Sequence, residues 1–191
     1  MSLHPRDQHG PWQIIARHAV YQDPWMSVRK DDVIRPDGLL GTYSTVRIKP
    51  GVCVIPMDRD GSIYLTQEFH YAVGRDTIEG ISGGIEDGES AEEAALRELQ
   101  EEVGVQAERL QHLGWVDPLT SALSSPTQLF CATELRMVEA SPEGTEQIQR
   151  IQVSLERGIQ MVMESEITHG PTCTAILKMA MLRNSGAIPA G

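Results

Sequence analysis

The sequence predicts an α/β protein built on a mixed sheet, with an antiparallel β section on its N-terminal side. Three observations predict this class. Runs of strand-forming residues fill most of the first 70 positions, a helical pattern with capping residues at both ends follows, and two further helical segments come after another set of strands. Strands interleaved with helices, several of them joined as hairpins, are typical of this class.

Residues 12–50 are expected to form the N-terminal antiparallel section. The three strand-like runs are WQIIARHAVY, WMSVRKDDVI and LLGTYSTVRI, and the tripeptide Pro36-Asp37-Gly38 suits a hairpin turn between the last two. Residues 1–11 are polar and are expected to be a disordered tail. Because three strands alone are only marginally stable, this section must pack against something else.

Residues 51–186 are expected to form the second domain. Its first two strands, 52–56 and 62–69, are expected to pair as a hairpin around the turn Asp58-Arg59-Asp60-Gly61. Further strands are expected near 111–116, 127–135 and 148–153, and helices over 154–165 and 172–183.

A helix is predicted over residues 91–103. Ser90 and Glu93 have the spacing of a capping box, in which two side chains satisfy the first free N–H groups of the helix. Gly104 stands where a left-handed C-terminal cap is needed. Apolar residues on one side of this helix are expected to pack into the core: Leu96, Leu99 and Val103.

The opposite side of the same helix carries a cluster of carboxylates. Glu98, Glu101 and Glu102 are three and four residues apart and share one face, with Arg97 as the one nearby cation, able to pair with Glu93 or Glu101. A solvated acidic face is the alternative, but like charges at these spacings repel. Carboxylates with too few cations suit a hard divalent ion, Mg²⁺ or Mn²⁺.

The segment around this helix resembles the complete Nudix box: Gly, five residues, Glu, seven residues, Arg-Glu-apolar, one residue, Glu-Glu, one residue and Gly-apolar. The matching positions are Gly83, Glu89, Arg97, Glu98, Leu99, Glu101, Glu102, Gly104 and Val105. The resemblance implies the Nudix fold, a mixed β-sheet sandwiched between helices, and a pyrophosphatase that uses Mg²⁺. In this family the metal ligands correspond to Glu98 and Glu102, with Glu101 alongside and the backbone carbonyl of Ser82.

Almost the whole chain, from about residue 12 to 181, is similar to the ADP-ribose pyrophosphatase and nucleoside-diphosphate-sugar branch of that family. Hydrolysis of the pyrophosphate bond of a nucleoside diphosphate sugar such as ADP-ribose is therefore expected. Homodimers of this branch use the N-terminal strands to reach the partner subunit. Two alternatives stay open: a non-catalytic regulator that binds a nucleotide sugar, and a Nudix hydrolase of another nucleotide.

The resemblance also suggests residues that bind substrate. Trp12 and Trp25 fall where relatives place aromatic residues against the nucleobase, although ordinary packing is the alternative for both. Arg29 is expected to meet a phosphate or to be solvated. His70 replaces a frequent phosphate-binding arginine, and Glu79 stands at an acidic position before the box.

Two kinds of catalytic residue are expected beyond the metal ligands. Arg97 is expected to orient a glutamate rather than to touch substrate. In relatives a glutamate in the loop before the penultimate strand activates water or binds a further metal. The resemblance therefore implies a general base in the loop before the strand that begins near Ile148, with Glu146 and Glu143 as candidates and Glu101 or Glu79 next in order.

Composition restricts the class of partner. The net charge of -11 argues against non-specific nucleic-acid binding, which needs clustered Lys and Arg. The three cysteines form no C-x-x-C pair and are expected to be reduced thiols. Because no apolar run has the length of a signal core or a membrane span, a cytoplasmic protein without membrane contact is expected.

Overall fold

The computed structural model describes residues 7–140 and 148–186, which fall into two compact units. The first unit ends at Lys49 and also takes in Asp117–Ser125, and the second begins at Pro50 and holds the rest. The chain thus divides within one residue of the boundary drawn from the sequence. The short segment from 117 to 125, however, returns to the first unit.

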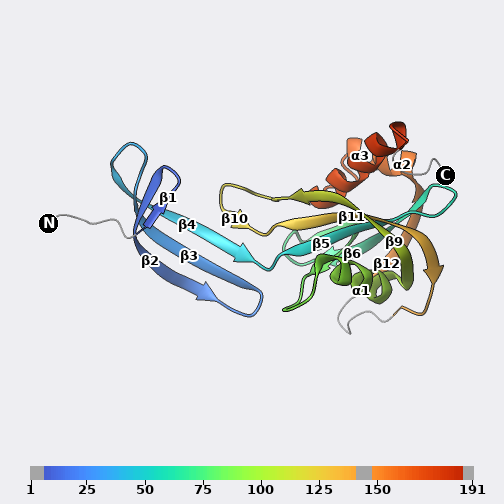
Figure 1. The fold of residues 1–191 in the computed structure, drawn as a ribbon, viewed down its shortest axis with the longest axis horizontal. Coiled ribbons are helices and arrows are strands. Elements are labelled where there is room, and N and C mark those ends of the chain that lie inside the picture. The colour runs from blue at the N-terminus through green and yellow to red at the C-terminus, as the bar shows by residue number, and fades with distance from the viewer. Residues whose placement is uncertain (1–6, 141–147, 187–191) are drawn as a thin grey trace. The chain divides into compact units, whose positions relative to one another are not determined.

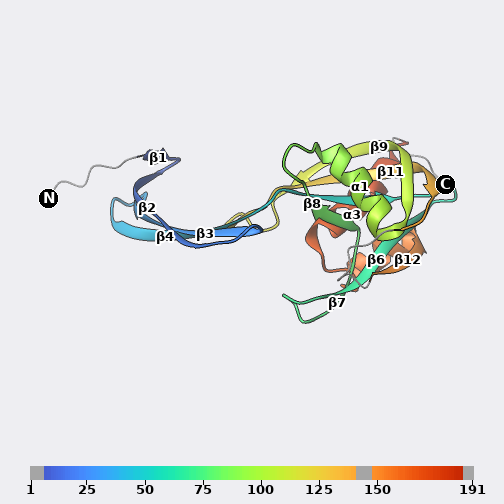
Figure 2. The same cartoon turned by 90° about the horizontal axis from the view of Figure 1, so that it is seen from below.

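The first unit is a five-stranded sheet in the order β1-β2-β3-β4-β10, with β10 parallel to β4 and the other pairs antiparallel. Its strands are β1 (Asp7–His9), β2 (Trp12–Gln22), β3 (Met26–Ile34), β4 (Leu40–Ile48) and β10 (Leu123–Ser124). Figure 2 shows β2, β3 and β4 nearly edge-on as a single layer. The three expected strands are confirmed.

Two details of this sheet go beyond the expectation. The turn between β3 and β4 closes with Gly38 at φ 82, a left-handed conformation that favours glycine. Within the stretch expected to be disordered, Asp7–His9 pair with β2 as a strand. The Asp7 carboxylate there accepts a hydrogen bond from Arg17, an interaction that residue-by-residue polarity does not reveal.

The second unit contains two sheets rather than the single mixed sheet that was expected. One has the order β8-β5-β11-β9, with β11 parallel to β5, and the other is antiparallel in the order β12-β6-β7. The strands are β5 (Gly51–Pro56), β6 (Ser62–His70), β7 (Arg75–Glu79), β8 (Ile81–Gly84), β9 (Val105–Val116), β11 (Thr127–Met137) and β12 (Gln149–Ser154).

The expected hairpin of the second domain is wrong in its pairing. Strands β5 and β6 exist, but they belong to different sheets, and an isolated bridge joins Met57, just after β5, to Ile63 of β6. Strand β5 pairs instead with β8 and β11, which come later in the chain.

Helices cover both faces of the mixed sheet. They are α1 (Ala91–Val103), α2 (Leu155–Met163) and α3 (Gly170–Asn184). Figure 1 shows α1 on one side of β5 and β11, with α2 and α3 on the other. Side chains of β5 alternate accordingly: Val52 and Val54 pack in the α1 core, while Cys53 and Ile55 pack in the core that contains α3. The expected sandwich is therefore confirmed.

The cysteines behave as buried thiols. Cys53 and Cys131 are fully buried, and burial raises the pKa of the Cys53 thiol to about 11 and that of Cys131 to about 12. Within residues 7–140 and 148–186, none of the helices has the length and apolar character required to cross a membrane.

Candidate active site

Helix α1 is held at both ends as the sequence predicts. The Ser90 hydroxyl accepts from the Glu93 N–H at 3.2 Å, and the Glu93 carboxylate accepts from the Ser90 N–H at 2.8 Å. Gly104 closes the helix at φ 62, a left-handed conformation. Because Glu93 serves the cap, Glu101 is the expected partner that pairs with Arg97.

The core-facing side of α1 differs from the prediction at one position. Leu99 and Val103 are buried, but Leu96 is 39% exposed. Two smaller side chains, Ala94 and Ala95, are completely buried in its place. Because a helix turns about 100° per residue, Leu96 is rotated away from Ala95 and lies outside the face that Ala95 and Leu99 bury.

Arg97 gathers the carboxylates of the box. Its Nε donates to Glu89 at 2.9 Å, and its Nη1 donates to Glu98 at 2.7 Å and to Glu101 at 3.0 Å. Its Nη2 also donates to the Gly84 carbonyl at 2.9 Å, which ties the helix to β8. These bonds raise the pKa of Arg97, and the Arg97 hydrogen bond lowers the pKa of Glu89.

Two further contacts bring the carboxylates of α1 against strand β8. Glu102 Oε1 accepts from the Ser82 N–H at 3.3 Å. A Cβ on Gly83 would lie 1.8 Å from Glu98 Oε1, so only glycine leaves room for that carboxylate. The structure therefore places Glu102 and Glu98 against the β8 backbone at Ser82 and Gly83, and Arg97 joins Glu101 to Glu98.

The donor set fits a hard divalent cation. Carboxylate and carbonyl oxygens are the ligands that Mg²⁺ and Mn²⁺ prefer, and Glu89, Glu98, Glu101 and Glu102 outnumber the single guanidinium of Arg97. As these side chains stand, no three His, Cys, Asp or Glu residues of the described chain form a group that could hold a metal ion. Glu98 and Glu101 turn to Arg97 instead. Arg97 binds one oxygen of each carboxylate, Glu98 Oε1 and Glu101 Oε2, so a cation would bind through the other oxygens, Glu98 Oε2 and Glu101 Oε1.

The two residues first expected to act as the general base, Glu143 and Glu146, lie outside the described residues. Their role stays a prediction from sequence.

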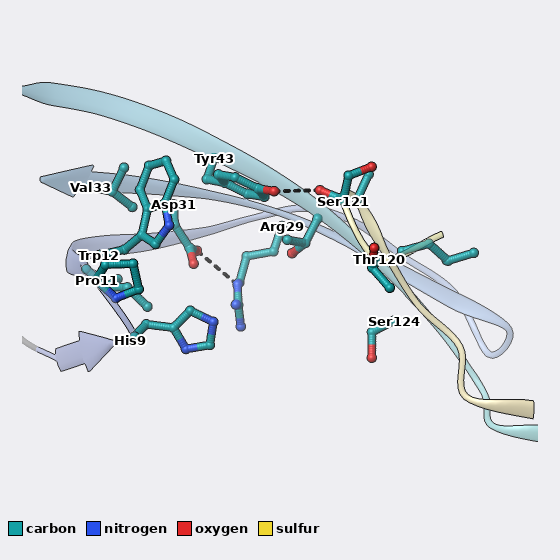
Figure 3. A pocket seen from close by; sticks show the side chains of 15 residues that line it. His9, Pro11, Trp12, Arg29, Asp31, Val33, Tyr43, Thr120, Ser121 and Ser124 are labelled. Carbon is teal, nitrogen blue, oxygen red and sulfur yellow. Dashed lines mark hydrogen bonds and ion pairs between the residues drawn. The ribbon is translucent and has the colours of Figure 1, made fainter. Parts of the chain in front are cut away.

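A cavity of about 390 Å³ lies within the first unit, and two predicted substrate-binding residues, Trp12 and Arg29, line it. The Trp12 ring meets Tyr43 edge-on at 5.3 Å between centroids. Figure 3 shows the Arg29 side chain extending into the space between Trp12 and the segment that carries Thr120. The cavity thus combines an aromatic wall with a cation.

A buried acid that the sequence analysis did not single out sets the position of Arg29. Asp31 is 6% exposed, and its Oδ1 lies 2.9 Å from Arg29 Nε without forming a well-directed hydrogen bond. Tyr43 donates its hydroxyl hydrogen to the Ser121 carbonyl at 2.6 Å, which fixes the opposite side of the cavity. Arg29 and Asp31 are two residues apart on β3, the spacing at which side chains share one face of a strand.

Trp25 lies elsewhere in the first unit and does not line this cavity. Its side chain is 69% exposed, and the Lys49 ammonium lies 5.8 Å from the ring centroid. The structure therefore separates the two tryptophans that the sequence analysis grouped together.

His70 and Glu79, the other two predicted substrate-binding residues, lie together in the second unit. His70 Nε2 is 3.3 Å from Glu79 Oε1. His169, for which sequence spacing gave no function, lies on the other side with Nδ1 3.1 Å from Glu79 Oε2. His169 and Glu79 are 90 positions apart in the sequence, and they meet because the N-terminus of α3 packs beside β7.

The fold and the carboxylate helix define a Nudix protein. Residues 47–161 match the NUDIX domain, more than half of the chain, so the chain belongs to the Nudix family and is a Nudix hydrolase. Residues 12–46 match the nucleoside diphosphate sugar hydrolase N-terminal domain. The expected family and fold class are confirmed.

Relatives cover nearly the whole length of the chain. An ADP-ribose pyrophosphatase from Bacillus subtilis (strain 168) is 28% identical over 170 residues, 85% of this chain and 89% of the relative. A methanol dehydrogenase activator from Bacillus methanolicus is 26% identical over the same shares. A crystal structure of an ADP compounds hydrolase shares the fold, with a TM-score of 0.80, 22% identity, and coverage of 98% of this chain and 100% of that one.

Proposed function

We propose that the chain hydrolyses the pyrophosphate bond of a nucleoside diphosphate sugar such as ADP-ribose, with Mg²⁺ as the preferred cation. The observation that carries the proposal is the placement of Glu98 and Glu102 against the backbone of Ser82 and Gly83 in the second unit. The nucleoside diphosphate sugar hydrolase N-terminal domain and the ADP-ribose pyrophosphatase relative support this choice of substrate.

The reaction transfers one phosphoryl group to water. The water oxygen forms a bond to one phosphorus, the bond from that phosphorus to the bridging oxygen breaks, and a nucleoside monophosphate and a sugar phosphate leave. Bound Mg²⁺ supplies positive charge to the phosphate oxygens. The proton lost by water needs an acceptor within hydrogen-bond reach, and Glu146 and Glu143 are the proposed candidates.

Arg97 acts in this proposal without touching substrate. It holds the carboxylates of Glu89, Glu98 and Glu101 in one place before the cation arrives. A preorganised set of ligands loses less side-chain entropy when the ion binds. Replacing the arginine should therefore weaken metal affinity before it affects chemistry.

The first unit is proposed to contribute nucleobase and phosphate contacts within a homodimer. The cavity beside Trp12 and Arg29 offers an aromatic wall and a guanidinium, which suit a base and a phosphate respectively. The sheet around it leaves large apolar side chains exposed, which supports association with a second copy: Val20, Tyr21, Trp25, Leu39, Leu40 and Tyr43.

Retention of all the box glutamates favours an enzyme over a non-catalytic nucleotide-sugar sensor. A sensor needs the binding surface alone and would not require the three carboxylates that pair with Arg97.

The experiment is a panel of nucleoside diphosphate sugars incubated with Mg²⁺, with products identified by mass. We expect a nucleoside monophosphate and a sugar phosphate, loss of activity with a chelator, and its return with Mg²⁺.

Glu98→Gln and Glu102→Gln should each lower kcat by roughly a hundredfold or more, since a metal ligand is lost. Glu92→Gln, an exposed change on the same helix, is the control. Full activity of both ligand variants at saturating Mg²⁺ would remove the proposed metal role.

A further inference from the structure

A cluster of hydrogen-bonding side chains surrounds the Glu79 carboxylate in the second unit. Glu79 Oε1 accepts from the Thr77 hydroxyl at 2.6 Å and lies 3.3 Å from His70 Nε2. Its Oε2 lies 3.1 Å from His169 Nδ1. The Glu79 side chain is only 15% exposed, so these three neighbours occupy most of its surface.

The carboxylate fixes which nitrogen of each imidazole carries hydrogen. An ionised carboxylate accepts and never donates, so each histidine must present an N–H to Glu79. His169 therefore carries its hydrogen on Nδ1, and His70 carries one on Nε2. A ring that carries only this hydrogen leaves its far nitrogen as an acceptor.

Thr172 is consistent with this arrangement. Its hydroxyl oxygen accepts from the Gly80 N–H at 2.7 Å and lies 2.8 Å from His169 Nδ1, so its two lone pairs meet two donors. Its own hydrogen is then directed to Cys53 Sγ, 3.6 Å away. Every polar atom of Thr172 has a partner when the His169 hydrogen lies on Nδ1.

The surroundings of His169 disfavour its protonated form. Burial lowers its pKa most, the Glu79 carboxylate opposes that effect, and His70 lowers the pKa further. The nearest cation on β7, Arg75, is bound through Nη2 to the Thr168 hydroxyl at 2.8 Å. The His169 side chain is 27% exposed, so solvent reaches part of the ring.

Hydrogen bonds connect this cluster to the proposed metal site. Thr172 binds the Gly80 N–H, the Gly80 carbonyl accepts from the Ser82 hydroxyl at 2.7 Å, and the Ser82 N–H binds Glu102. Ser82 follows Glu79 by three positions, which limits the distance between their Cα atoms to about 10 Å. The Glu79 cluster therefore lies close enough to the proposed metal site to be considered for contact with a group attached to a bound diphosphate.

We propose that His169, oriented by Glu79, accepts a hydrogen bond through Nε2 from a hydroxyl of the sugar attached to the diphosphate. This inference rests on the proposed function and names a residue that reads the sugar. A ring nitrogen that carries no hydrogen accepts from a hydroxyl and repels a phosphate oxygen. Glu79 is then a positioning residue, because Thr77 and the two histidines already occupy its oxygens.

The hydrogen assignment is tested directly by ¹⁵N NMR of the histidine side chains in the full chain. We expect the Nδ1–H form for His169 and its loss in Glu79→Gln, whose amide can present a donor where the carboxylate only accepts. With Mg²⁺ present, ribose 5-phosphate should shift the His169 Nε2 resonance and inorganic phosphate should not. An Nε2–H form in the wild type, or equal shifts with both probes, would overturn the assignment.

The sugar-reading role is tested with two substrates that share the same pyrophosphate bond. ADP-ribose carries hydroxyls beyond the diphosphate, whereas the β-methyl ester of ADP carries none. His169→Asn keeps a donor at the Nδ1 position for Glu79 and Thr172 but deletes Nε2. His112→Asn, on β9, is the control.

We expect His169→Asn to lower the kcat/KM ratio of ADP-ribose to methyl ester roughly three- to tenfold, the effect of one neutral hydrogen bond. The loss should fall on KM, because the bond is present before and during reaction. An unchanged ratio, or an equal loss of kcat on both substrates, would contradict the proposal. A wild type that cleaves neither substrate refutes the proposed function instead, and the ribose 5-phosphate titration then decides the role of His169.

Discussion

At the scale of single residues, Gly83 has the sharpest consequence. An alanine there would place Cβ 1.8 Å from Glu98 Oε1, whereas at Gly84 an added Cβ meets nothing within 4 Å. The clash falls on the end of a flexible side chain, so Glu98 can move away at small cost to the fold. Gly83→Ala should lower kcat by roughly a hundredfold while the melting temperature falls by only a few degrees. Gly84→Ala should match the wild type in both assays, and equal activity of the two variants would show that the position of Glu98 does not matter.

Arg97 gives a second prediction at this scale. Its removal leaves the carboxylates of Glu89, Glu98 and Glu101 to repel one another, and Arg97→Gln should lower the free energy of unfolding by about 2 kcal/mol near pH 6 without metal. Because Arg97 lowers the pKa of Glu89, its stabilisation is present above the ordinary carboxyl pKa and is lost as pH falls through the lower folded value.

Urea unfolding at pH 6 and near pH 3.5 measures this difference. The gap between the wild type and Arg97→Gln should narrow at the lower pH. Arg109→Gln removes an exposed pair with Glu134 at 3.6 Å and should cost less than about 1 kcal/mol at either pH. A gap that widened in acid would contradict the arrangement around Arg97.

At the scale of elements, the sequence predicted the features that depend on residues close together in the chain. Helix α1 follows from its caps, since a hydroxyl, a carboxylate and a glycine at fixed offsets satisfy backbone groups whatever lies nearby. The pairing of β5 did not follow, because alternating hydrophobicity predicts a strand and is silent about its partner. Strands β7 and β8 also escaped prediction, since Gly80 interrupts them. A Cβ on Gly80 would come within 2.6 Å of Ile55, so that glycine permits a close approach.

The candidate site likewise contains residues that could be identified from the sequence and residues that could not. The box residues that lie along α1 and β8 could be identified by spacing, because one helix and one adjacent strand present them together. His169 and Asp31 could not, since each acquires its neighbours by tertiary packing or by facing a cavity.

The N-terminal cap of helix α1 gives a prediction at the scale of elements. Ser90→Ala removes the acceptor for the Glu93 N–H and should lower the free energy of unfolding by about 1 kcal/mol. Ser90→Thr keeps a hydroxyl in the same place and should lose much less. Urea unfolding of both variants with metal removed measures the difference, and an equal loss in the two would mean that the hydroxyl does not cap the helix.

At the scale of the whole molecule, the first unit has too little buried surface of its own. Ile14 and Val33 are the buried apolar side chains of its described residues, while Val20 and Leu40 are each 62% exposed. A single-layer sheet with exposed apolar side chains is marginally stable and tends to associate with another protein surface. A second copy of the chain would cover it, in agreement with the expected homodimer.

Charge placed on this surface tests the assembly. We expect the wild type to be a dimer at micromolar concentration by light scattering, and Val20→Lys with Leu40→Lys to shift it toward monomer, because two ammonium groups would have to be desolvated on association. Met163→Lys changes a side chain that is 72% exposed on α2 in the second unit and should leave the dimer intact. Activity on ADP-ribose should fall with the dimer if the partner completes the site. A monomeric wild type with full activity would show that one chain is sufficient, and the uncovered sheet would then need another explanation.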